Sequence, residues 1–385
     1  MSLGAPARPA AIPLMRPWLG KEEAAAAGEA ILSGWVAQGP RVGAFERAFC
    51  DRVGAAHGVA LSSCTTALHL ALLLLGVGPG DEVVVPSLSF IATANAVVHA
   101  GARPVFADVD DLQNLSPATI EPVLTPRTRA VVLVHQAGVP ADVDAVTALC
   151  EARGFAVVED AACAIGSTYR GAPVGAGSRL AAFSFHPRKL VTTGEGGMLV
   201  TARADWAERA RRLREHGMSI SAAARHASAS PIAERYLEVG FNYRMTDVQA
   251  AIGLVQLGRL DALVERRRTL AAGYRRRLAG VPGLQLVTDP PHGTANFQSF
   301  WIVLPEESPV GRDELLRLLA AQGISARRGI MAAHLEPAYA GQRHAALPVT
   351  ERFARRSLLL PLFHEMTEAE QDRVVEVVRS AVGGG

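Results

Sequence analysis

Lysine is nearly absent from this chain of 385 residues. Of its 39 lysine and arginine residues, only two are lysines, Lys21 and Lys189. Arginine keeps its proton in proteins and cannot act as an amine nucleophile, whereas a lysine can once its pKa is lowered. A lysine kept among so many arginines therefore suggests covalent amine chemistry at Lys189, most often a Schiff base. The alternative is a leftover surface lysine.

Cysteine is also scarce, and its spacing excludes several kinds of site. No two of the four cysteines are close enough for a C-x-x-C pair, so the sequence indicates neither a disulfide framework nor a zinc site. We therefore expect a reducing, cytoplasmic compartment. The four residues are Cys50, Cys64, Cys150 and Cys163.

Long apolar runs and a strong charge of one sign are missing as well. The longest apolar stretch, 67–77, is too short to cross a bilayer, and the first residues lack the pattern of a signal peptide. The formal net charge is +2, and the arginine clusters fall in helix-like segments, where they are best interpreted as solvated faces. The sequence thus gives no support for a membrane or nucleic-acid partner.

The hydrophobic pattern predicts an α/β fold with a mostly parallel central sheet flanked by helices. Runs rich in valine alternate with helical patterns, as expected for strands that are buried on both faces. A helical stretch at 245–279 is expected to connect a large domain, 40–260, to a smaller α+β domain made of 1–39 and 261–385. The expected strands are 59–62, 82–86, 104–109, 130–135, 155–160, the hairpin-like pair 180–185 and 197–201, and 297–304; other expected helices include 142–153, 312–322 and 368–382.

Candidate ligand-binding residues follow the ends of several of these strands, where an open α/β sheet places a ligand. Small hydroxyl residues at 62–66 begin a helix, which suits either a phosphate or an ordinary helix cap. Asp160 ends a buried strand and needs a cationic partner, either a protonated pyridine nitrogen or an arginine. Phe90 follows another strand, as a core residue or as an aromatic plate against a flat ligand. Ser184, five residues before Lys189, could add a phosphate contact.

A phosphate cradle, a strand-end aspartate, an aromatic plate and a single lysine match what pyridoxal 5′-phosphate (PLP) needs. The aspartate would keep the pyridine nitrogen protonated, and the lysine would hold the aldehyde and later move a proton.

The chain also resembles the DegT/StrS family of PLP-dependent aminotransferases, which have the aspartate aminotransferase-like fold type I. The resemblance runs nearly end to end and rests on several motifs in the same order. These motifs are 34–40 (GWVAQGP), 64–69 (CTTALH), 81–87 (DEVVVPS), 159–162 (EDAA), 184–197 (SFHPRKLVTTGEGG), 213–218 (LREHGM) and 240–245 (GFNYRM).

The resemblance implies a role for each matching residue. Lys189 would carry the cofactor as a Schiff base, and Asp160 would pair with its pyridine nitrogen. Phe90 and Ala162 would pack on the two faces of the ring. The remaining implied contacts are to the phosphate, from Thr65, Thr66, Ser184 and the backbone of Cys64.

Two further positions carry implications. Asn242 would reach the phosphate of the cofactor in a second subunit, so the resemblance implies a homodimer with shared active sites. Where many relatives have Gln or His in contact with the phenolic oxygen of the cofactor, this chain has Cys163, a weak hydrogen-bonding group. Some relatives replace the lysine with histidine and act as sugar dehydratases; Lys189 argues against that activity.

The function implied by the resemblance is transfer of an amino group from glutamate or glutamine to a nucleotide-linked keto-sugar, as in aminosugar biosynthesis. A keto-cyclitol acceptor, as in aminocyclitol antibiotic biosynthesis, and a non-enzymatic PLP-binding regulator are alternatives. A PLP-dependent aldolase or decarboxylase lacks motif support, and a cysteine desulfurase needs a late cysteine that is missing here. From their positions among the family landmarks, the candidates for the substrate pocket are His186, Arg328, His334 and Tyr339.

Overall fold

A computed structural model describes residues 10–221 and 233–383. Its central element is a seven-stranded sheet in the order β1-β9-β8-β5-β4-β2-β3. The strands pair in parallel except at β9, which runs antiparallel to both of its neighbours. The sheet is formed by β1 (His57–Leu61), β2 (Glu82–Pro86), β3 (Arg103–Ala107), β4 (Thr128–Val134), β5 (Ala156–Asp160), β8 (Ala181–Ser184) and β9 (Gly197–Thr201).

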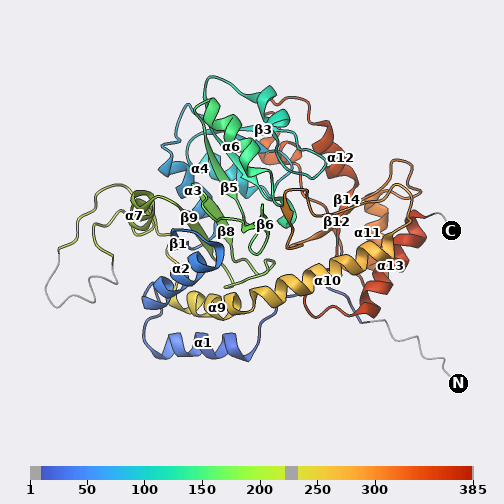
Figure 1. Ribbon diagram of the computed structural model, residues 1–385, viewed down its shortest axis with the longest axis horizontal. Helices are drawn as coiled ribbons and strands as arrows, with labels where there is room; N and C mark the ends of the chain where they lie inside the picture. The colour runs from blue at the N-terminus through green and yellow to red at the C-terminus, as the bar shows by residue number, and fades with distance from the viewer. Residues whose placement is uncertain (1–9, 222–232, 384–385) are drawn as a thin grey trace.

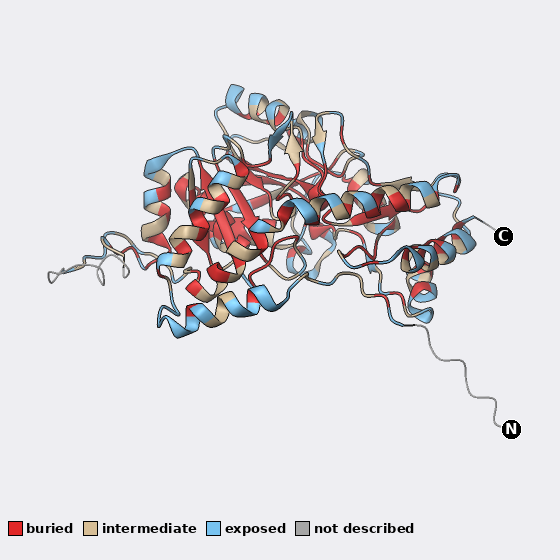
Figure 2. Cartoon of the chain, turned by 60° about the horizontal axis from the view of Figure 1, so that its bottom comes forward, coloured by how far each residue is buried: buried red, intermediate tan, exposed pale blue. Residues whose placement is uncertain are grey.

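This sheet confirms the predicted fold class. Every residue of β2 and of β9 is buried, as the uninterrupted apolar runs require when helices cover both faces of a sheet. Figure 2 shows the buried residues concentrated in these strands, whereas the helices present exposed outer faces. The surrounding helices are α2 (Pro40–Val53), α3 (Cys64–Leu74), α4 (Ala92–His99), α5 (Pro117–Ile120), α6 (Val143–Ala152) and α7 (Ala204–Leu213).

A second sheet of four strands, in the order β10-β12-β14-β13, has its own hydrophobic core. Buried aromatic and aliphatic residues such as Phe300, Ile302 and Leu358 fill the space between this sheet and its helices. The elements are β10 (Gln285–Leu286), β12 (Phe300–Val303), β13 (Arg327–Arg328), β14 (Ser357–Leu360), α11 (Arg312–Ala321), α12 (Pro348–Arg356) and α13 (Glu368–Val382). A small third sheet joins β11 (Gly293–Thr294), β6 (Thr168–Tyr169) and β7 (Ala172–Pro173).

Two helices, rather than the single stretch predicted at 245–279, connect the sheets. α9 (Asp247–Gly258) ends at Gly258, and α10 (Leu260–Leu278) begins after Arg259, which caps both helices. Glycine is a poor helix former, and this explains a break at that point. In Figure 1, α10 extends from the region of the large sheet to α13 at the other end of the molecule.

Residues 10–39 divide their contacts between the two regions. Ile12 forms a parallel bridge with Ile324, and the carbonyl of Leu14 accepts a hydrogen bond from Leu362, beside the four-stranded sheet. In contrast, α1 (Lys21–Leu32) packs against α9. The predicted domain boundaries at residues 39–40 and 260–261 stay a prediction.

The topology determines where a ligand can bind. β1, β2, β4, β5 and β8 all end at one edge of the large sheet, because they run in the same direction. Loops from this edge face the four-stranded sheet, and the cavity described below lies between them. None of the helices within 10–221 and 233–383 has the length and apolar character that crossing a bilayer would require.

Candidate active site

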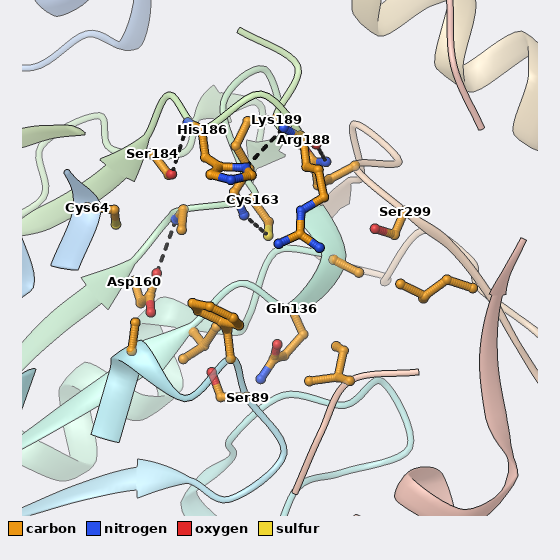
Figure 3. Close-up of a pocket in the computed structure, with 18 of the residues that line it drawn as sticks. Cys64, Ser89, Gln136, Asp160, Cys163, Ser184, His186, Arg188, Lys189 and Ser299 are labelled. Atoms are coloured by element: carbon orange, nitrogen blue, oxygen red, sulfur yellow. Dashed lines mark hydrogen bonds between the residues drawn. The ribbon is translucent and has the colours of Figure 1, made fainter. Parts of the chain in front are cut away.

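A cavity of about 430 Å³ opens at the carboxyl edge of the parallel strands. It brings together residues from strand ends that are far apart in the sequence: Cys64 after β1, Phe90 after β2, Asp160 at the end of β5, and Lys189 in the loop after β8. Figure 3 shows the labelled side chains around this space. Most of the residues that the sequence singled out for cofactor binding therefore share one cavity.

Asp160 is a buried carboxylate, with only 5% of its surface exposed. Its Oδ2 accepts a hydrogen bond of 2.8 Å from Thr93 Oγ1, and its Oδ1 accepts one of 3.2 Å from the backbone N–H of Ala162. No ion pair to Asp160 exists among the described residues. Burial raises the pKa of Asp160, and these two hydrogen bonds together with the positive charge of Lys189 only partly oppose that effect. Within the described residues the carboxylate thus has hydrogen bonds but no direct ion pair.

Lys189 has its amine in contact with a thiol. Lys189 Nζ donates a hydrogen bond of 3.0 Å to Cys163 Sγ, the contact drawn in the centre of Figure 3. Burial lowers the pKa of Lys189, but the neighbouring Cys163, Cys64 and Asp160 together raise it, and the net direction is upward. Without a ligand, the amine is therefore held in its protonated form.

Two layers of polar contacts hold the Lys189 loop in place. Gln298 accepts a hydrogen bond from the backbone N–H of Leu190 through Oε1 and donates one to the carbonyl of Arg188 through Nε2. The guanidinium of Arg267, on α10, donates in turn to the carbonyls of Phe297 and Gln298. Desolvation of this buried guanidinium lowers the pKa of Arg267 to about 10. The loop is thereby tied to α10 as well as to its own sheet.

The beginning of α3 provides a cradle of hydrogen-bond donors. Among the described residues, the backbone N–H groups of Cys64 and Thr65 have no acceptor, and both residues line the cavity with Ser184. At Gly197, a Cβ atom would lie only 2.4 Å from the backbone of Ser63, so glycine is what allows β9 to approach this helix start. Such a helix N-terminus suits a phosphate group.

Thr66, predicted as a phosphate contact, has its hydroxyl in the cap of α3. Its Oγ1 donates to the carbonyl of Ser63 at 2.7 Å and accepts from the backbone N–H of Ser63, which closes a capping box. Thr66 is not among the residues that line the cavity. The helix cap therefore accounts for the Thr66 hydroxyl, whereas the predicted phosphate contacts of Cys64, Thr65 and Thr66 stay a prediction.

The remaining predicted cofactor contacts fall into two groups. Phe90, 59% exposed, and Ala162 both line the cavity and are available to a flat ligand. Asn242 is exposed and forms a bridge with Glu215, outside the residues that line this chain's cavity. Its predicted contact with a second subunit stays a prediction.

Of the four predicted substrate-pocket residues, two line the cavity and two do not. His186 and Arg328 line the cavity, and Arg328 is paired with Glu336 at 2.9 Å. His334 and Tyr339 do not line it. His334 is buried, with Nδ1 2.6 Å from Ser87 Oγ, and Tyr339 donates to Asn95 Oδ1 at 2.8 Å, so both have structural partners.

Several cavity residues were not found from the sequence. Thr93 holds Asp160, and Gln298 holds the Lys189 loop, yet neither belongs to a motif that points to such a role. Arg188 and Arg327 also line the cavity. Arg188 adjoins Lys189 and could have been suspected from that position alone; Arg327 could not.

Comparison with known proteins decides the family. The model of the DegT/DnrJ/EryC1/StrS aminotransferase family matches residues 17–379. The chain belongs to this family. It is a PLP-dependent aminotransferase, and solved structures of similar proteins include a PLP form and a PMP form.

Solved structures of other members superpose over almost the whole of this aminotransferase. The aminotransferase TlmJ from Streptoalloteichus hindustanus is 38% identical, with a TM-score of 0.88 over 96% of this chain and 98% of that one. DesV from S. venezuelae, solved in complex with a ketimine intermediate, is 37% identical, with a TM-score of 0.87 over 97% and 98%. DesI, solved in the presence of its TDP-sugar product, is 33% identical, with a TM-score of 0.87 over 99% and 96%.

The residues of the aminotransferase fit PLP. Asp160 is a buried carboxylate in need of a cationic N–H, and the start of α3 offers unused N–H donors for a phosphate. Lys189 offers the amine to which an aldehyde can bond. Cys163, the departure noted in the sequence, lies beside that amine.

Replacing Asp160 should separate stability from cofactor binding. The pKa of Asp160 is raised in the folded state, so between the ordinary aspartate pKa and the raised value the folded apoprotein binds more protons than the unfolded chain. The stability of the apoprotein therefore falls as the pH rises through that interval. Asp160→Asn should therefore increase the apoprotein's free energy of unfolding at pH 8 by about 1 kcal/mol, with a smaller gain at pH 5, and should weaken PLP retention.

Urea unfolding of the apoproteins at both pH values measures this difference. Asp51→Asn is the matched control, because Asp51 is exposed on α2, and a change within about 0.5 kcal/mol is expected. A lower stability of Asp160→Asn than of the wild type at both pH values would contradict the argument.

Removing the thiol of Cys163 should make Lys189 more reactive in the apoprotein. Cys163→Ala removes a neighbour that raises the pKa of Lys189, so more of the amine is unprotonated at pH 8. Labelling of Lys189 by trinitrobenzenesulfonate should then be several-fold faster, as followed by peptide mass spectrometry.

Lys21 is exposed and is the only other lysine, so it serves as an internal reference in each sample. Cys163→Ser keeps most of the side-chain volume without an acidic thiol, and we expect it to react as fast as the alanine variant. A serine variant that reacts at the wild-type rate would show that space, and not charge, controls the amine.

Proposed function

We propose that this aminotransferase moves an amino group from glutamate or glutamine to the keto group of a nucleotide-linked sugar. The observation that carries the proposal is the position of Lys189, whose amine lines one cavity with Asp160 and with the N–H groups at the start of α3. The likeness to DesI, which was solved with a TDP-sugar product, supports the class of acceptor.

PLP, when bound, supplies an electron-accepting ring that stabilises negative charge on a substrate carbon. Asp160 would support this role, because a buried carboxylate that lacks a direct ion pair favours a protonated ring nitrogen. Thr93 and the N–H of Ala162 fix the orientation of both carboxylate oxygens.

Lys189 would act first as the point of attachment and then as the base. Once the donor's amine takes its place, Nζ is free to remove the proton from the donor's α-carbon, and later to return a proton to the acceptor carbon. The hydrogen bonds from Leu190 to Gln298 and from Gln298 to Arg188 hold the loop on both sides of this lysine, which limits the distance that Nζ can move.

We also propose that the enzyme acts as a homodimer. Segments 215–219 and 235–242 pair through backbone hydrogen bonds and form an arm that, in Figure 1, extends away from the large sheet beyond α7. The arm carries Tyr236, Leu237 and Val239, which are 65%, 55% and 89% exposed. An arm with this much apolar surface is suited to bury it against a second copy, and Asn242 lies at its base.

The absorbance of the purified, PLP-loaded enzyme tests the proposed reaction. Addition of L-glutamate should bleach the yellow band of the bound cofactor to the pyridoxamine form, and a TDP-linked 4-keto sugar should restore it. Lys189→Ala should lose the wild-type band and slow the half-reaction by roughly 10² to 10⁴-fold.

Lys21→Ala is the matched control, since it removes the other lysine, and should behave as the wild type. A yellow band that neither glutamate nor glutamine bleaches would refute the proposed donor. Bleaching without recovery on any keto-sugar nucleotide, but with recovery on a keto-cyclitol, would replace the proposed acceptor with that alternative.

Substitution on the arm tests the proposed dimer. Val239→Asp places a charge on the exposed apolar surface and should convert a dimer into monomers, with loss of most transaminase activity. Light scattering gives the mass in solution. Leu318→Asp, on the exposed side of α11, is the control and should leave the mass unchanged. A wild type that is monomeric and fully active would refute this proposal.

A further inference from the structure

Two guanidinium groups in the cavity have no negative partner. Arg188 precedes Lys189, and its backbone is fixed on both sides: the N–H donates to His186 Nδ1 at 3.1 Å, and the carbonyl accepts from Gln298. Arg327 enters from β13 of the second sheet. Within residues 10–221 and 233–383, neither guanidinium has a hydrogen bond or an ion pair.

Arg328, next to Arg327 in the sequence, differs from these two arginines because it has a negative partner. Arg328 is also in β13, but its guanidinium is neutralised by Glu336 at 2.9 Å. Arg327 lines the same cavity as Arg188 and Arg328, and burial together with their positive charges lowers the pKa of Arg327. Repelling cations that remain exposed in a cavity are suited to bind an anion from solution.

The acidic side chains of the cavity do not supply that anion. Those that line it are Asp160 and Glu195. Asp160 has Thr93 and Ala162 as partners, and Glu195 lies beside His186 at 4.0 Å. Ser299 and Gln136, which also line the cavity and are labelled in Figure 3, are neutral. This end of the cavity is therefore positively charged.

The arginine end of the cavity is distinct from the cradle of N–H groups at the start of α3. In Figure 3, Arg188 and Ser299 lie on the opposite side of the cavity from Cys64 and Ser184, with Lys189 and Cys163 between them. A ligand held at both ends would place its middle beside the reactive amine. The phosphate of the cofactor belongs to the Cys64 and Ser184 side, which leaves the arginine side for another anionic group.

We propose that Arg188 and Arg327 form a second anion subsite, which binds an oxyanion group of the substrate. This rests on the proposed function, under which both substrates are anionic: the donor carries carboxylates, and the acceptor carries a diphosphate. Two guanidinium groups offer paired N–H donors that match either group. Arg188 comes from the loop after β8 of the large sheet, and Arg327 comes from β13 of the four-stranded sheet. The subsite therefore joins the two regions of the chain around the ligand.

Binding of inorganic diphosphate to the PLP-loaded enzyme tests the subsite directly. PLP occupies the cradle at α3, so calorimetric titration reports on the arginine side. Arg188→Gln and Arg327→Gln should each weaken diphosphate binding at least tenfold, while the yellow band shows that each variant still folds and holds PLP. Arg355→Gln, on the exposed face of α12 and paired with Glu351, is the control and should bind as the wild type.

Separate half-reactions identify the source of the anion. Slower bleaching by glutamate in both variants assigns the subsite to the donor carboxylate, and slower recovery by the keto-sugar nucleotide assigns it to the acceptor diphosphate. Wild-type diphosphate binding together with unchanged rates in both half-reactions would overturn the proposal. If the wild type itself is not bleached by glutamate, the proposed function fails, while the diphosphate titration still tests the subsite.

Discussion

A carboxylate buried without a direct ion pair is the constraint on which the rest of this site depends. Asp160 ends β5 inside the protein, and the hydrogen bonds from Thr93 and Ala162 do not replace a positive charge. The folded chain therefore carries an unfavourable group that a ligand with a cationic N–H relieves. Cofactor binding and the stability of the folded chain are therefore coupled at this residue.

The sequence predicted those parts of the fold that follow from local pattern. Valine-rich runs gave the parallel strands, and the break between β8 and β9 located Lys189 in a loop at the correct edge of the sheet. Lys189 and Asp160 could be selected because each is chemically costly or rare at its position. The short strand β14 was missed, since four residues after an arginine-rich helix give no clear period.

The parts of the site that escaped prediction depend on tertiary contacts. Gln298 contacts the Lys189 loop across more than a hundred residues of sequence, and Arg327 shares a cavity with Arg188 only because the second sheet lies beside the first. Their residue types are common on any surface, so nothing local marks them. Conversely, the sequence grouped Thr66 with the phosphate contacts because a helix cap and an anion site use the same hydroxyl residues.

The hydrogen bonds of Gln298 couple the position of the Lys189 loop to that of α10. Arg267 on α10 holds the carbonyls of Phe297 and Gln298, and Gln298 holds the backbone on either side of Lys189. A rotation of α10 relative to the large sheet would therefore be transmitted to the backbone on either side of Lys189.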